Sequence, residues 1–138
     1  MRSIAREADF IRAMNVLRQF MNLDQWRFFA DLCNGPEGTH YTDKAIAYAN
    51  RITTMPATYD TDGQGEDAIV NLHYFRGGCD WYIIEKDVEM PQHQAFGWCD
   101  LGMGCPELGY VSIEELKEVG AELDLYWEPK ALREVKRG

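Results

Sequence analysis

The chain has 138 residues and a formal net charge of −9, a length that suits one domain able to bury about two thirds of the surface exposed by the unfolded chain. Four Trp, seven Tyr and six Phe supply a core, which argues against a disordered protein. No stretch approaches the roughly 20 apolar residues of a membrane span, and residues 1–7 lack the apolar run of a signal peptide. We therefore expect a soluble cytoplasmic protein without a membrane partner.

The charge is divided into blocks along the chain. Residues 1–58 hold seven basic and six acidic side chains, whereas residues 59–128 hold three basic and sixteen acidic ones. Residues 129–138 hold four basic side chains and one acidic side chain. An acidic block repels the phosphates of nucleic acid and attracts basic protein surfaces. Direct nucleic-acid binding is therefore disfavoured, and the expected partner is a basic host protein.

The N-terminal part of the chain predicts three helices. Apolar residues at helical spacing predict the first helix over residues 5–21. Asn22 is the expected cap of a second helix, which the Gly-Pro-containing run 34–38 ends. Thr42 is the expected cap of a third helix that stops before Pro56.

The rest of the chain predicts an antiparallel sheet of about five strands. Segments 68–75 and 79–86 are rich in β-branched and aromatic residues and flank a Gly-Gly turn, so they predict a hairpin. Further strands are expected over 93–101, 107–111 and 122–127.

Two short helices complete the predicted order of elements. Ser112 and Glu115 form a capping box for a helix that Gly120 ends, between the last two strands. Pro129 is the expected first residue of a basic terminal helix. The fold class is therefore α+β, with N-terminal helices (1–55) packed on one face of the sheet (56–138) in a single domain of residues 1–138.

Several motifs of the sheet half occur in an order that matches one small bacterial family. They are Ile69-Val70-Asn71-Leu72-His73-Tyr74-Phe75, Asp80-Trp81-Tyr82-Ile83-Ile84-Glu85, Phe96-Gly97, the run Glu107 to Leu116, and Leu123-Asp124-Leu125-Tyr126-Trp127-Glu128-Pro129-Lys130. Over about residues 52–136 the chain resembles a domain of unknown function found in phages, plasmids and other mobile elements of bacteria. The resemblance implies no chemistry. It implies an accessory protein of a mobile element, where dispensable genes often counter host defence.

Residue types suited to metal binding occur without a matching pattern. The loop Asp60–Asp67 begins like a calcium-binding loop, but Asn71 stands where a bidentate Glu belongs. The four cysteines form no CxxC pair, so we expect reduced and mostly buried thiols rather than zinc ligands. We expect no cofactor and no metal, although the sequence leaves calcium binding by the loop open.

The predicted hairpin also carries residue types used in acid and base catalysis. His73, Asp80 and Glu85 could converge, but Asp80 and Glu85 are an odd number of residues apart. In a regular strand they point to opposite faces, so only one of them shares a face with His73. The sequence therefore favours a non-catalytic protein, and the alternative is a metal-dependent hydrolase or nuclease that uses His73 and nearby carboxylates.

Aromatic residues alternate along the predicted strands, so neighbouring rings point to opposite faces of the sheet. Outward rings surrounded by carboxylates would form a surface of the kind that anchors protein interfaces. The predicted partner-binding residues are Trp81, Tyr82, Glu85, Glu107, Tyr110, Glu114, Glu115, Glu118, Asp124, Tyr126 and Glu128.

An acidic surface also serves solubility alone, but the segregation of charge into one block favours a partner. Together with the mobile-element context that the resemblance implies, this leads us to expect an anti-defence inhibitor, of the anti-CRISPR or anti-restriction type, that binds a basic, nucleic-acid-binding host protein.

Overall fold

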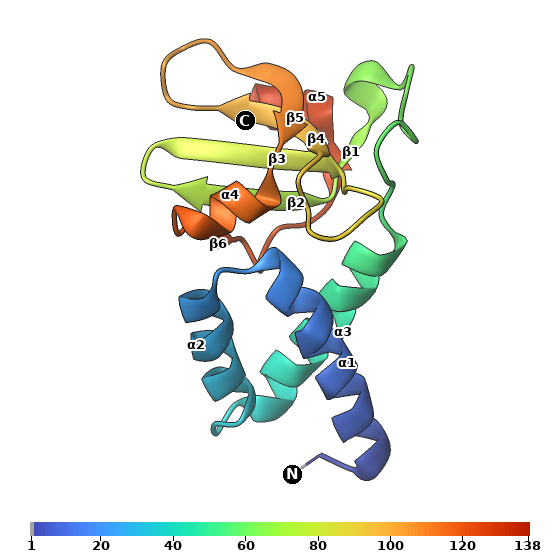
Figure 1. Cartoon of the computed structure of the whole chain (residues 1–138), viewed down its shortest axis with the longest axis vertical. Coiled ribbons are helices and arrows are strands. Elements are labelled where there is room, and N and C mark those ends of the chain that lie inside the picture. Colours follow the sequence, from blue (N-terminus) through green and yellow to red (C-terminus); the bar gives the residue numbers. More distant parts are fainter. Residues whose placement is uncertain (1) are drawn as a thin grey trace.

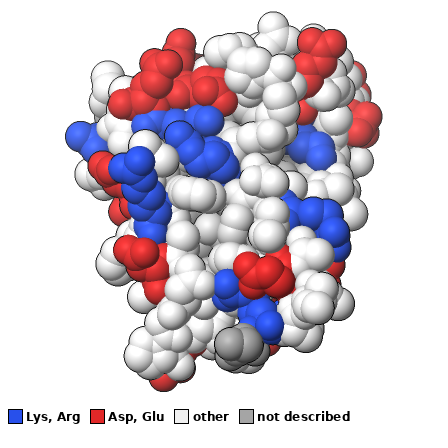
Figure 2. All heavy atoms as spheres, turned by 60° about the horizontal axis from the view of Figure 1, so that its bottom comes forward, with Lys and Arg blue, Asp and Glu red and all other residues white. Residues whose placement is uncertain are grey.

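The structure, a computed structural model, describes residues 2–138 and divides into a helical end and a sheet end. Three helices come first: α1 (Ile4–Phe20), α2 (Leu23–Cys33) and α3 (Gly38–Thr54). Figure 1 shows them at one end of the molecule, with the sheet at the other. In Figure 2, where the helical end comes forward, basic and acidic side chains lie among one another. This mixture agrees with the near-neutral charge of residues 1–58.

Local capping signals set the starts of the first two helices. The Ser3 hydroxyl accepts a hydrogen bond from the Arg6 N–H at 3.1 Å, and the Asn22 side chain accepts one from the Gln25 N–H at 2.8 Å. Asn22 is therefore the cap that the sequence predicts. Helix α2 then ends at Cys33, directly before the predicted stop.

The prediction that Thr42 caps the third helix is wrong, because α3 begins earlier, at Gly38. A Cβ atom on Gly38 would lie 2.5 Å from the Cys33 carbonyl oxygen, so the absence of a side chain permits a tight connection from α2. Thr42 lies inside the helix and is 1% exposed. Its hydroxyl accepts a hydrogen bond from the Arg2 guanidinium at 3.1 Å.

Five strands form the main antiparallel sheet, as predicted. They are β2 (Leu72–Arg76), β3 (Cys79–Glu85), β4 (Ala95–Asp100), β5 (Glu107–Val111) and β6 (Glu122–Leu123), in the spatial order β5-β4-β3-β2-β6. Helix α4 (Ile113–Glu118) connects β5 to β6, so the predicted short helix between the last two strands is confirmed. The α+β class is likewise confirmed.

A second, smaller sheet holds the end of the chain. Strand β1 (Ile69–Val70) pairs with β7 (Lys130–Ala131), which leads into α5 (Leu132–Arg137). A 3-10 turn, η1 (Gly65–Asp67), precedes β1. Within residues 2–138, no helix is long and apolar enough to cross a membrane.

Two predicted boundaries near the end of the chain are wrong. The strand predicted over 122–127 ends at Leu123, because the Asp124 carboxylate accepts the Tyr126 N–H at 3.0 Å and turns the backbone. Pro129 does not start the terminal helix, because the residues that follow it pair with β1 before α5 begins.

The main sheet has two faces in different surroundings. Its inner face packs against the three helices, with Leu72, Tyr74 and Ile83 all 0% exposed. The Tyr74 hydroxyl donates a hydrogen bond to the Phe20 carbonyl, joining the sheet to the end of α1. The opposite face, called here the outer face, carries a smaller buried cluster that includes Ile84 and Leu132 of α5.

All four cysteines are free, but they differ in exposure. Cys33 is buried, and burial raises the pKa of its thiol to about 11. Cys79 and Cys99 are half-buried and Cys105 is exposed, so the prediction of mostly buried thiols holds fully for Cys33 alone.

Strands β3 and β4 approach unusually closely at Gly97, beside an irregularity in the register between Ile83 and Glu85. A Cβ atom on Gly97 would lie 2.2 Å from the Tyr82 carbonyl oxygen. The neighbouring Gly109 of β5 pairs with Gly97, yet a Cβ atom there would meet nothing within 4 Å. The two glycines therefore provide a matched pair for substitution.

We expect Gly97→Ala to lower the free energy of unfolding by about 2 kcal/mol, because the backbone of β3 or β4 must shift. Thermal melting should show a fall of about 5 °C or more. Gly109→Ala is the control and should change the midpoint by much less. Equal effects of the two substitutions would contradict the close approach at Gly97.

Burial of two tyrosines predicts a loss of stability at alkaline pH. Burial raises the pKa of Tyr74 and of Tyr48 well above the ordinary value of 10.0. Above that pH the unfolded chain loses these protons while the folded chain keeps them, so the free energy of unfolding falls. The stability that the two protonated tyrosines contribute is therefore fully present below pH 10 and is lost as the pH rises further.

In urea unfolding followed from neutral to alkaline pH, Tyr74→Phe should reduce the alkaline slope by about 1.4 kcal/mol per pH unit. It should also lower stability at neutral pH by about 1 kcal/mol through the lost hydrogen bond to Phe20. Tyr126→Phe is the control at a side chain that is 71% exposed. An unchanged slope in Tyr74→Phe would show that its phenol ionises in the folded state.

Candidate partner-binding surface

Antiparallel pairing arranges the outer face in rows that run across the strands. Glu122, Phe75, Asp80 and Asp100 form the first row, across β6, β2, β3 and β4. His73, Tyr82, Trp98 and Leu108 form the second, across β2 to β5. Phe96 and Tyr110 form the third. The face thus changes from carboxylates at one end to aromatic rings in the middle and at the other end.

The first row is the acidic end of this face. Glu122 is exposed and Asp100 is partly exposed, and neither forms a salt bridge with another residue in the described range 2–138. Phe75 lies between Glu122 and Asp80 and is 36% exposed. The row therefore offers carboxylates to a partner on either side of an accessible ring.

His73 links the acidic row to the aromatic one. Its Nε2 atom lies 2.7 Å from an Asp80 oxygen, and its Nδ1 atom lies 3.0 Å from an Asp124 oxygen. The imidazole also stacks on Tyr82, with ring centres 4.7 Å apart. Since both ring nitrogens face carboxylates, His73 ties β2 to β3 and to the segment after β6. Asp80 therefore shares a face with His73. The sequence predicted this for either Asp80 or Glu85.

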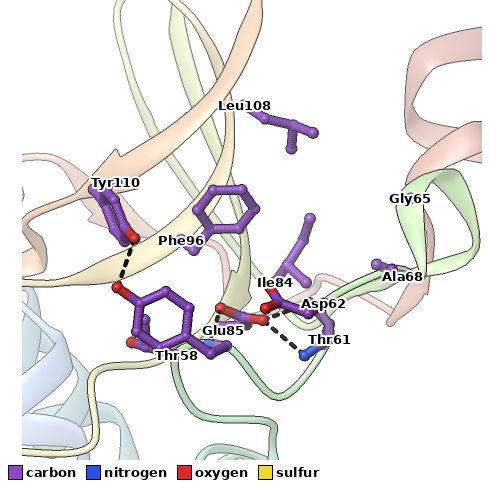
Figure 3. Close-up of a pocket in the computed structure, with 12 residues that line it drawn as sticks. Thr58, Thr61, Asp62, Gly65, Ala68, Ile84, Glu85, Phe96, Leu108 and Tyr110 are labelled. Atoms are coloured by element: carbon purple, nitrogen blue, oxygen red, sulfur yellow. Dashed lines mark hydrogen bonds between the residues drawn. The ribbon is translucent and has the colours of Figure 1, made fainter.

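A pocket of about 230 Å³ opens at the third row, between the strands and the loop 58–68. Figure 3 shows Phe96, Leu108 and Tyr110 extending toward it, with Glu85 below them and Ala68 across the opening. The hydroxyl of Tyr110 donates a hydrogen bond to the Tyr59 hydroxyl at 2.9 Å. This bond raises the pKa of Tyr110.

Glu85, one of the predicted partner-binding residues, has a buried carboxylate and is not part of the exposed surface of the strands. The residue is 3% exposed. Its Oε1 atom accepts the Tyr59 N–H at 2.8 Å, and its Oε2 atom accepts the Thr61 N–H at 2.9 Å together with the Thr61 hydroxyl (Figure 3). These donors fix the loop 58–63 over the strand. Glu85 therefore forms part of the pocket wall, beneath the protein surface.

A break in strand alternation explains this position. The register of β3 against β4 shifts between Ile83 and Glu85, so Ile84 and Glu85 both line the pocket. The expectation that Asp80 and Glu85 point to opposite faces assumed a regular strand and fails here. Glu85 still does not join His73, because the loop 58–63 supplies its hydrogen-bond donors.

The structure brings three of the predicted partner-binding residues together. Tyr82, Tyr110 and Asp124 all contribute to the outer face or its edge. Tyr82 is half-buried, and burial raises its pKa. Tyr110 is 58% exposed and is the most accessible of the three.

Two predicted aromatic residues lie elsewhere. Trp81 is half-buried and packs against the main core on the inner face, so it does not contribute to the outer face. Tyr126 is exposed, but its ring lies under the Lys44 ammonium at 4.4 Å, at the junction with α3. Tyr126 therefore belongs to a different surface.

The remaining predicted carboxylates are accessible but separate from the outer face. Glu114 forms a salt bridge with Lys117 at 2.9 Å within α4, while Glu115 and Glu118 of that helix are exposed. Glu107 and Glu128 are also exposed. Glu107 pairs with Cys99, on the inner side of the sheet edge.

Several residues of this surface were not predicted. They are Tyr59, Asp62, Phe75, Phe96, Trp98, Asp100, Leu108 and Glu122. Alternation along 95–100 and 107–111 contains the signal for Phe96, Trp98 and Leu108. No local signal places Tyr59, whose positive φ of 78° accompanies the hydrogen bonds that its backbone and hydroxyl make.

The basic end of the chain folds back on the acidic block. Lys136 forms a salt bridge with Glu66 at 2.9 Å, and its ammonium lies 4.3 Å from the centre of the Trp98 ring. Arg133 forms a salt bridge with Asp67. Helix α5 thus covers part of the outer face with positive charge, which the blocks of charge in the sequence did not indicate.

The same contacts occupy the loop that begins like a calcium site. Glu66 and Asp67 pair with α5, and the Asp60 carboxylate accepts the Ala57 N–H at 2.9 Å. Across residues 2–138, no group of three or more His, Cys, Asp or Glu side chains is placed to hold a metal ion. Asp60, Glu66 and Asp67 therefore bond to separate groups of the chain itself, while Asp62 is exposed.

Comparison with known proteins places the chain in a family. No curated protein and no solved structure matches it. Residues 46–132, more than half of the chain, match the family described as "Protein of unknown function (DUF2958)". This range overlaps the one that carries the resemblance in the sequence. The chain therefore belongs to the DUF2958 family, whose members share a domain of unknown function.

Proposed function

We propose that this protein is a non-catalytic binding protein that docks its outer face on a basic protein. The observation that carries the proposal is the first row of that face. There Glu122 and Asp100 have no salt-bridge partner within the described chain, and Phe75 is exposed between carboxylates. Repulsion among carboxylates in one row is relieved when a partner supplies cations.

The two kinds of side chain would contribute in different ways. Exposed carboxylates steer a basic partner toward the face and fix its orientation. Aromatic rings such as Phe75 and Tyr110 supply apolar area that is lost from water in the complex, and such rings are common among the residues that dominate binding energy. The outer face has both within neighbouring rows.

Helix α5 supports the proposal from within the molecule. Lys136 lies between a carboxylate and the Trp98 ring, which is an environment that stabilises a positive charge by salt bridging and by cation–π attraction. The uncovered part of the face has the same two components. A basic partner would extend this pattern beyond α5.

The class of partner follows from the chemistry of the surface. Proteins that bind nucleic acid display Lys and Arg side chains that hold phosphates. Carboxylates that occupy those side chains compete with the nucleic acid. We therefore propose a nucleic-acid-binding protein as the target, and an inhibitor of a defence complex, of the anti-CRISPR or anti-restriction type, would act in this way.

Binding to a fluorescein-labelled oligolysine peptide, followed by fluorescence anisotropy, tests the charge mechanism. We expect affinity to fall by about tenfold or more between low and physiological ionic strength, because exposed charges are screened. Affinity that does not change with salt would contradict an electrostatic interface.

Charge reversal locates the interface. Asp100→Lys with Glu122→Lys should weaken peptide binding by about tenfold. Asp31→Lys with Glu37→Lys makes the same change in net charge at exposed positions of the helical end, and Glu115→Lys with Glu118→Lys makes it on α4. Both should have smaller effects at physiological ionic strength. Equal losses for all three pairs would show that net charge governs binding and would contradict an interface on the outer face.

A further inference from the structure

We infer that the pocket at the third row of the outer face binds the ammonium group of one lysine side chain. The inference rests on the proposed function only for the source of that lysine, which is the basic partner. The ligand chemistry itself, an alkylammonium ion, follows from the pocket.

The walls of the pocket are aromatic. Tyr59, Phe96 and Tyr110 line it, and the hydroxyls of the two tyrosines are joined at 2.9 Å. The Phe96 and Tyr110 rings meet edge to face, with centres 5.8 Å apart. Electron-rich ring faces attract cations, and sets of such rings recognise alkylammonium groups. The walls therefore suit an organic cation with an aliphatic stem.

The buried end of the pocket carries a negative charge. Glu85 lines it and is 3% exposed, and Asp62 lies at its exposed rim. No Lys or Arg contributes to the lining. Lys86, the nearest basic residue along the chain, instead donates to the carbonyls of Ile52 and Thr53 at the end of α3, at 2.7 and 2.9 Å. The negative charge of the pocket is therefore left without a cation in the described chain.

The hydrogen bonds of Glu85 favour an ammonium ion over a guanidinium ion. A carboxylate has about four acceptor positions. Oε2 already accepts two donors from Thr61, whereas Oε1 accepts only the Tyr59 N–H. One further donor fits at Oε1, but the paired donors of a guanidinium need positions on both oxygens.

The size of the pocket suits one side chain. Its volume of about 230 Å³ is below the range of roughly 300–1,000 Å³ that drug-sized ligands need. The chain also places its own lysines over aromatic rings, with Lys136 at 4.3 Å from the Trp98 centre and Lys130 at 4.6 Å from the Trp127 centre. The pocket offers rings of the same kind together with a buried carboxylate.

Titration of the ¹⁵N-labelled protein with n-butylammonium chloride tests the inference by NMR. Amide shifts should concentrate at residues 58–65, 84–85, 96 and 108–110, with affinity in the millimolar range expected for so small a ligand. At matched ionic strength, n-butylguanidinium should bind more weakly and the neutral n-butanol more weakly still. Equal shifts with all three compounds, or shifts spread over the acidic surface, would overturn the inference.

Paired variants test the pocket walls. Tyr110→Leu should weaken n-butylammonium binding by about threefold or more through the lost ring. Tyr126→Leu removes a tyrosine that is also exposed but lies outside the pocket, and it should leave binding unchanged. Glu85→Gln should abolish binding. If it also disturbs the fold, Asp62→Asn gives the second test of charge and should weaken binding by a smaller factor.

The oligolysine peptide separates this inference from the proposed function. If the peptide binds with strong salt dependence while n-butylammonium does not bind, the pocket inference is wrong and the proposed function stands. If n-butylammonium binds at the pocket but the peptide does not bind, the proposed function fails instead. Binding of both, with the peptide weakened by Tyr110→Leu, supports the two together.

Discussion

The pocket of the outer face depends on one buried interaction, the acceptance of three hydrogen bonds by the Glu85 carboxylate. Two backbone N–H groups and one hydroxyl of the loop 58–63 converge on it. A buried carboxylate is tolerated only when donors replace the water it has lost. The loop can therefore take this position only while Glu85 faces outward, and that orientation depends on the shifted register beside Ile83. Tyr59 and the pocket follow from the position of the loop.

Where a local signal was sufficient, the sequence predicted the fold. Asn22 and Ser112 cap the helices that they were expected to cap, since their side chains bond to N–H groups three residues ahead. The start of α3 depends on a tight turn after α2, and the delayed start of α5 depends on a contact between distant residues. Gly38 approaches Cys33, and Lys130 pairs with Val70. Neither contact produces a pattern of residue types that can be recognised in a single sequence.

The candidate surface was predictable to a smaller degree. Alternation correctly separates Trp81 from Tyr82, but it does not say which of the two faces the helices. Burial of Tyr74 and Ile83 beside Trp81 settles this point in the structure. The charge of the block 59–128 was visible in the sequence, yet its pairing with α5 was not, because salt bridges such as Lys136 to Glu66 join residues far apart in the chain.

The close approach at Gly97 separates the position that sets the strand spacing from the positions that form the outer face. At this one position of β4 a side chain would clash with the backbone of β3. Phe96 and Trp98, on either side of it, contribute to the outer face. We therefore expect substitutions at these flanking positions to leave the strand spacing at Gly97 intact. The spacing between β3 and β4 and the chemistry of the outer face are thus set by different positions of one strand, so side chains 96 and 98 can change while the architecture beneath stays the same.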